Sequence, residues 1–95
     1  MNLVISYFLE RDYSAAIDLA QGMILEYPGL TAPYRWLAAA RGQIGQTDAA
    51  YEALCKAIEG SPESFDFYVH SRPPWYRPED YEHMLDGLRK AGWQG

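Results

Sequence analysis

The sequence resembles itself when it is shifted by 34 residues, and this internal repeat restricts the possible folds more than any other feature. The matching positions hold small, apolar or helix-ending residues: Leu3 with Leu37, Ala16 with Ala50, Ile24 with Ile58, and Pro28 with Pro62. A fixed period of a few tens of residues is typical of proteins that stack copies of one supersecondary unit. The chain is therefore predicted to consist of stacked units.

Each copy contains apolar residues at the spacing of an amphipathic helix. These residues are Tyr13, Ala16, Ile17, Ala20, Ile24 and Tyr27 in the first copy, and Ala50, Tyr51, Leu54, Ala57 and Ile58 in the second. Because they fall on one face of a helix, each set predicts the second helix of its unit. The first helices are expected over residues 2–10 and 32–44. We therefore predict an all-α fold of helix-turn-helix repeats.

The residues at the predicted helix ends agree with this interpretation. Thr31 can cap the helix that follows it, and Pro33 is tolerated in the first turn of that helix. Gly45 accepts the positive φ that ends a helix, and Thr47 with Asp48 offers a side-chain oxygen to begin the next one. We expect a short turn between the two helices of the second unit.

A 34-residue period of paired helices resembles the tetratricopeptide repeat. The complete unit at 31–62 carries this resemblance through six residues at positions that define the repeat: Tyr34, Leu37, Gly45, Ala50, Ala57 and Pro62. Ala50 and Ala57 would let the paired helices approach closely. The chain departs from the pattern at Ala38, where glycine is usual, and at Arg41 and Leu54, where aromatic residues are usual.

The resemblance implies a protein-binding function, because tetratricopeptide units bind extended peptides or neighbouring helices in the groove lined by the first helix of each pair. The repeat register assigns these residues to that groove: Ile5, Phe8, Leu9, Arg35, Ala39, Gly42 and Gln43. Family members that bind chaperone tails have asparagine where this chain has Ile5 and Ala39, so we expect an apolar groove instead. An alternative stays open, in which Ile5, Phe8 and Leu9 are core residues against a preceding unit.

The first unit, residues 1–28, is shorter than the repeat and lacks its leading aromatic residue. Its opening run from Leu3 to Leu9 is apolar almost all round, and such a helix is normally buried on more than one side. We therefore expect a truncated repeat with another repeat or domain packed before it, or else the inner helix of a small bundle. An uncovered first helix would also favour a homo-oligomer.

The tail, residues 63–95, is predicted to leave the repeat pattern. A short helix is expected to about His70, followed by a proline-rich spacer that cannot be helical. A last helix from Pro78 to about Ala91, ended by Gly92, would fold back as a cap. The residues expected to pack in this tail are Trp75, Tyr81, Leu85 and Leu88.

Residues 32–95 also resemble the extreme carboxyl end of a group of proteobacterial regulatory proteins. In those proteins a class III adenylate or guanylate cyclase domain, or a winged-helix DNA-binding domain, precedes tetratricopeptide repeats. The resemblance implies an alternative role as the regulatory or dimerising end of a nucleotide cyclase, although no cyclase site residue maps onto this chain. The mass of the native protein in its source cells distinguishes that alternative from a free-standing module.

Composition restricts the partners. Thirteen acidic and eight basic residues give a net charge of −5, which argues against binding to nucleic acid or to anionic lipid. The apolar stretches are too interrupted for a membrane span. Cys55 is the only cysteine, and no signal-peptide pattern precedes the first helix, so a cytoplasmic location is expected.

Catalytic residues are not expected in this chain. His70 and His83 are the only histidines, and no cysteine or histidine cluster has the spacing of metal ligands. Glu79, Asp80 and Glu82 are interpreted as charges at the start of a helix. We therefore predict a non-catalytic protein–protein interaction module that needs no metal or cofactor.

Overall fold

The computed structural model describes residues 2–72, 74 and 76–94, and that part of the chain forms six α-helices and no strand. The helices are α1 (Asn2–Leu9), α2 (Tyr13–Glu26), α3 (Ala32–Gln43), α4 (Thr47–Gly60), α5 (Pro62–His70) and α6 (Pro78–Lys90). The predicted all-α class is confirmed. Every helix in the described residues is too short or too polar to span a lipid bilayer.

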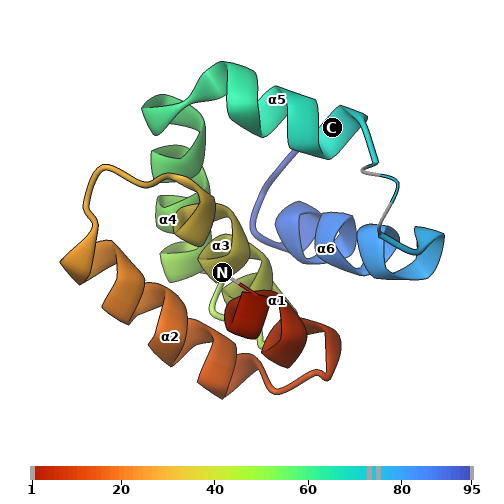
Figure 1. Cartoon of the computed structure of the whole chain (residues 1–95), viewed down its shortest axis with the longest axis horizontal. Helices are drawn as coiled ribbons and strands as arrows, with labels where there is room; N and C mark the ends of the chain where they lie inside the picture. The colour runs from red at the N-terminus through yellow and green to blue at the C-terminus, as the bar shows by residue number, and fades with distance from the viewer. Residues whose placement is uncertain (1, 73, 75, 95) are drawn as a thin grey trace.

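Helix α3 is at the centre of the molecule. Helices α2, α4 and α6 all pack extensively against α3, while α1 packs on α2 and also reaches α3. In Figure 1, α5 crosses the top of the view beside the end of α4, and α6 returns below it toward α3. Most of the α3 surface is therefore buried against other helices.

The core joins α1, α3 and α6. Its largest fully buried side chains are Trp36, Phe8, Met84, Leu88, Val4 and Pro33. The Phe8 ring meets Trp36 and Tyr13 edge to face, with ring centroids 5.4 and 5.5 Å apart, an arrangement that adds to the stabilisation from burial. Helix α1 is therefore part of the core, and Leu3 is its one strongly exposed large apolar side chain among the described residues.

Helices α3 and α6 cross at very close range because both have small residues at the crossing. A Cβ atom added to Gly87 would lie 2.5 Å from the carbonyl oxygen of Ala39, and one added to Gly42 would run into the carbonyl oxygen of Gly87. Both obstacles are backbone atoms, which cannot rotate away as a flexible side chain can. The crossing therefore requires glycine at both positions.

Glycine ends two of the helices as predicted. Gly45 follows α3 with a φ of 82°, and Gly92 follows α6 with a φ of 114°. Both values lie in the left-handed region, which residues with a Cβ atom rarely adopt. Helix α3 itself ends at Gln43, one residue earlier than expected.

The predicted side-chain caps are wrong. Thr31 is the N-cap residue of α3, as predicted, but its side chain makes no capping hydrogen bond. Helix α4 begins at Thr47 and has no side-chain cap, so Thr47 is inside the helix that it was expected to cap. Among the described residues a side-chain cap forms at α2, where the Asp12 carboxylate accepts a hydrogen bond of 3.3 Å from the backbone N–H of Ala15.

The last helix folds back along α3 and is also tied to α5. Leu85 and Leu88 are buried, and the Tyr81 hydroxyl donates a hydrogen bond of 2.6 Å to the carbonyl of Val69 in α5. Trp93, just beyond α6, meets the buried Phe65 of α5 edge to face. Trp75, which was also expected to pack here, lies outside the described residues.

His83 connects α6 to the first helix pair. Its ring stacks on Phe8 with centroids 4.4 Å apart, and its Nε2 atom lies 2.7 Å from the Tyr13 hydroxyl and 3.3 Å from Nη1 of Arg11. Since arginine can only donate, Nε2 must accept, which requires it to be unprotonated. Burial, and next the nearby Arg11 charge, lower the pKa of His83 below its ordinary 6.5.

This lowered pKa predicts a loss of stability in mild acid. Below pH 6.5 the unfolded chain binds a proton at His83 more readily than the folded chain does, so the free energy of unfolding falls as the pH drops through the window between 6.5 and the folded pKa. Chemical denaturation at neutral and mildly acidic pH measures this effect. His83→Gln should reduce the pH dependence in that window. Equal pH dependence in wild type and His83→Gln would contradict the assignment.

Candidate functional site

The face of α1 and α3 that the sequence predicts to bind a partner is covered by α6. Ala39 is fully buried beneath Gly87, and Phe8 is stacked under His83. The Gln43 amide donates hydrogen bonds to the His83 carbonyl and the Asp86 carboxylate, and accepts one of 3.0 Å from Lys90. These residues therefore form an interface within the chain, and partner binding there stays a prediction that would require α6 to move.

The other predicted groove residues are not brought together into one open surface. Ile5 and Leu9 are half-buried against the core, and Leu9 borders a small void near Trp36. Arg35 is only 6% exposed and faces α5, where its Cζ atom lies 4.2 Å from the centroid of the Tyr68 ring. Burial lowers the pKa of Arg35, and the contact with the aromatic ring offsets part of the cost of burying its charge.

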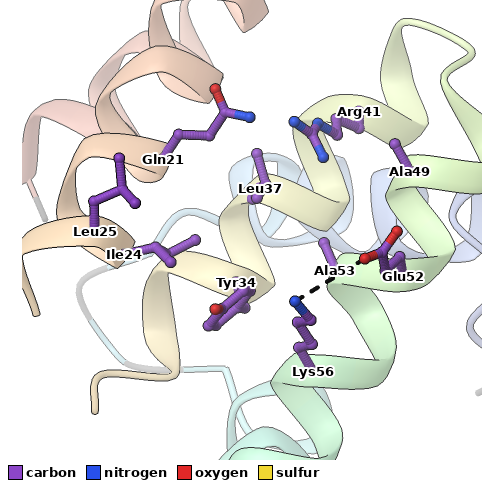
Figure 2. A pocket seen from close by; sticks show the side chains of 10 residues that line it. All are labelled: Gln21, Ile24, Leu25, Tyr34, Leu37, Arg41, Ala49, Glu52, Ala53 and Lys56. Atoms are coloured by element: carbon purple, nitrogen blue, oxygen red, sulfur yellow. Dashed lines mark ion pairs between the residues drawn. The ribbon is translucent and has the colours of Figure 1, made fainter. Parts of the chain in front are cut away.

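The structure has a cleft on the opposite side of α3, between α2 and α4 (Figure 2). Tyr34, Leu37 and Arg41 of α3 line this cleft; at 3.6 residues per turn, they lie on the helix face opposite Ala39 and Gln43. The cleft has a volume of about 420 Å³. Because α6 covers one face of α3 and the cleft lies on the other, the chain's own last helix leaves it open.

The floor and walls of the cleft are mostly apolar. Leu37, only 4% exposed, and the Tyr34 ring come from α3, while α4 contributes Ala49 and Ala53. Helix α2 contributes Ile24 and Leu25, and Leu25 is 85% exposed at the rim. A partner that covered Leu25 would remove this apolar surface from water, which is favourable.

The polar residues of the cleft are Gln21, Arg41, Glu52 and Lys56. Lys56 is close to Glu52, with Nζ 4.0 Å from Oε1, and its ammonium group lies 5.8 Å from the centroid of the Tyr34 ring. In Figure 2 the guanidinium of Arg41 points toward the Gln21 amide. Two cations and one anion leave the cleft lining with one excess positive charge, on a chain whose net charge is −5.

Within the described residues, Arg41 has no partner for its charge. Its Nε atom is buried and makes no hydrogen bond within the described part of the chain, and no ion pair to its guanidinium is found there. A buried donor without an acceptor is uncommon in folded proteins, since leaving it unpaired costs free energy. Arg41 therefore brings to the cleft lining a positive charge that no acidic side chain of the described residues neutralises.

Sequence reasoning identified this site only in part. Tyr34 and Leu37 were predicted as repeat-defining residues, and both line the cleft. Gln21, Leu25, Glu52 and Lys56 were missed because a helical repeat exposes many such residues. One signal was present in the sequence: Arg41 occupies a position where the tetratricopeptide pattern has an aromatic residue, and this departure falls inside the cleft.

The side chains of the cleft do not form a catalytic or metal-binding arrangement. Within the described residues, no group of three or more histidine, cysteine, aspartate or glutamate side chains is placed to hold a metal ion. Glu52 is the one carboxylate in the cleft lining, and it is paired with Lys56. The lining offers apolar contact and one excess positive charge, which suits binding.

Comparisons of the chain with known protein families, with curated proteins and with solved structures find no match.

Proposed function

We propose that the chain is a non-catalytic protein–protein interaction module that binds a short segment of a partner protein in the cleft between α2 and α4. The observation that carries the proposal is the open apolar cleft over Tyr34 and Leu37, with Leu25 exposed at its rim. Its volume is comparable to that of sites that hold a few apolar groups of a ligand. Burial of Leu25 by the partner would supply part of the binding free energy.

The tetratricopeptide resemblance supports the same class of function. The order of the helices supports it too, because α1 with α2 and α3 with α4 follow one another as two pairs, each joined by a short turn. Under this proposal the chain is of tetratricopeptide type, but its own α6 occupies the face on which members of that family bind peptides. The partner would then bind on the α2–α4 side.

A protein segment suits the cleft better than a small molecule does. The rim residue Leu25 extends most of its side chain into solvent, so a ligand contained within the cleft would leave it uncovered. A partner whose surface continues past the rim would cover it, as the apolar centre of a protein interface does.

The proposal is tested by selecting binders from a library of random short peptides displayed on phage. Peptides that bind the wild-type chain are synthesised, and their affinities are measured by fluorescence anisotropy against Leu25→Glu and Leu3→Glu. Both leucines are exposed, at 85% and 64%, so neither change should unfold the protein. We expect Leu25→Glu to weaken binding about tenfold or more and Leu3→Glu, outside the cleft, to leave it unchanged.

Three results would contradict the proposal. The library could yield no binder, or both variants could bind the selected peptides as well as wild type does. Alternatively, sedimentation could show that the wild-type chain self-associates and that Leu25→Glu abolishes this, which would assign the cleft to a second copy of the chain.

A further inference from the structure

The cleft calls for apolar groups in the partner, and the unpaired guanidinium of Arg41 adds a second requirement to the partner's chemistry. Arg41 is half-buried, its Nε atom is inaccessible to solvent, and neither a carboxylate nor a carbonyl accepts from that atom within the described residues. The other cation of the cleft differs, because Lys56 has Glu52 and the Tyr34 ring beside it. Arg41 is therefore the uncompensated charge of the cleft.

A partner that covers the cleft would raise the free energy of the Arg41 charge by removing its water. A partner that seals the mouth with apolar groups alone would remove the water that solvates the Arg41 guanidinium, and an isolated buried charge is strongly unfavourable. A partner that brings an acceptor would avoid that cost and would gain a charge-assisted hydrogen bond. The cleft therefore discriminates against purely apolar segments.

A single carboxylate matches the cleft best. The positive charges of Arg41 and Lys56 exceed the negative charge of Glu52 by one. One carboxylate of a partner neutralises this excess. A phosphate group would bring up to two negative charges and would leave the cleft negative, on a chain that already has a net charge of −5. The planar guanidinium fits two oxygens of either group, so the charge balance is what favours the carboxylate. Figure 2 places the Gln21 amide opposite Arg41, where its N–H group can donate to the same carboxylate.

We infer that the partner segment carries an aspartate or glutamate beside its apolar residues, and that this carboxylate pairs with Arg41. The inference rests on the proposed function and names the chemistry of its partner. The apolar residues occupy the floor formed by Tyr34 and Leu37, and the carboxylate lies at the mouth between Arg41 and Gln21.

A double-mutant cycle tests this pairing with the peptides selected against the wild-type chain. Each peptide is made twice, once as selected and once with its aspartate or glutamate replaced by asparagine or glutamine. Both forms are titrated into wild type, Arg41→Gln and Arg89→Gln. Arg89→Gln is the matched control, because it removes one positive charge from an exposed position on α6, outside the cleft.

We expect the selected peptides to contain an acidic residue, and either single change to weaken binding about tenfold. The two changes together should weaken it no further than either one alone, since both remove the same ion pair. Arg89→Gln should have no such coupling. In a ¹⁵N-resolved spectrum, the Nε–H signal of Arg41 should shift when the acidic peptide binds and stay unchanged with its amide form.

Two outcomes would overturn the inference, and they are distinguishable from failure of the proposed function. Peptides that lose affinity with Leu25→Glu but bind Arg41→Gln as well as wild type would keep the cleft as the binding site and reject the carboxylate. Additive losses from Arg41→Gln and the peptide change would also reject the pairing. If no peptide binds at all, the proposed function fails and this inference fails with it.

Discussion

Replacing Gly87 by alanine is expected to destabilise the protein by about 2 kcal/mol or more, because overpacking a tightly packed contact typically costs 1–3 kcal/mol. The added Cβ atom would lie 2.5 Å from the carbonyl oxygen of Ala39, so α3 and α6 would have to separate. Gly42→Ala should act in the same way from the other helix. Urea denaturation followed by circular dichroism measures both changes.

Gly22→Ala is the matched control for this prediction. Gly22 is in the middle of α2, and an added Cβ atom would have no neighbour within 4 Å. Alanine is the better helix former by about 1 kcal/mol, so this variant should be more stable than wild type. If Gly87→Ala and Gly22→Ala changed the stability in the same direction, the close crossing of α3 and α6 would be wrong.

Phe8→Ala is expected to have the largest effect of any truncation in α1. Phe8 is fully buried between Trp36, Tyr13 and His83. Removing a buried aromatic ring costs about 3–5 kcal/mol, a large part of the total stability of a small domain. The variant should unfold at a much lower urea concentration, if it folds at all.

Phe67→Ala is the control for Phe8→Ala, because it removes the same kind of side chain from an exposed position. Phe67 is 58% exposed on α5, so its truncation should change the free energy of unfolding by less than about 1 kcal/mol. A Phe8→Ala protein as stable as the Phe67→Ala protein would show that α1 is detached from the core. In that case Phe8 would be available to a partner, as the repeat register predicts.

The helix boundaries could be predicted from the sequence because they depend on local chemistry. Gly45 and Gly92 adopt positive φ, and Pro78 begins α6 because proline is tolerated in the first turn of a helix. The side-chain caps were predicted less well, because Thr31 and Thr47 can satisfy their hydroxyl groups in several ways. Hydrogen bonding of a hydroxyl depends on atoms that the local sequence does not specify.

The docking of α6 could not be predicted in the same way. Gly42 and Gly87 are far apart in the sequence, and each one alone appears only to weaken its own helix. Their importance follows from the close approach of two backbones, which is a property of the tertiary structure. For this reason Ala39 and Gln43 were expected on an open groove, and Phe8 either there or in a core against a preceding unit, whereas in the structure all three contact α6.

The cleft was hidden from sequence reasoning for a related reason. Tyr34 and Leu37 belong to the repeat pattern, so they were interpreted as packing residues alone. The cleft exists because α2 and α4 lie on either side of α3, and that spacing cannot be read from periodicity. Arg41 was recognised as a departure from the pattern, but its unpaired guanidinium is visible only in three dimensions.

Intermolecular nuclear Overhauser effects between the labelled protein and a selected peptide would locate the bound partner, which we propose lies between α2 and α4. We expect protons of the peptide's apolar side chains to give cross-peaks to the methyl groups of Leu25 and Leu37 and to the Tyr34 ring. Cross-peaks to Leu3, Ile5 or Leu9 instead would place the partner on α1, and the proposed binding site would be wrong.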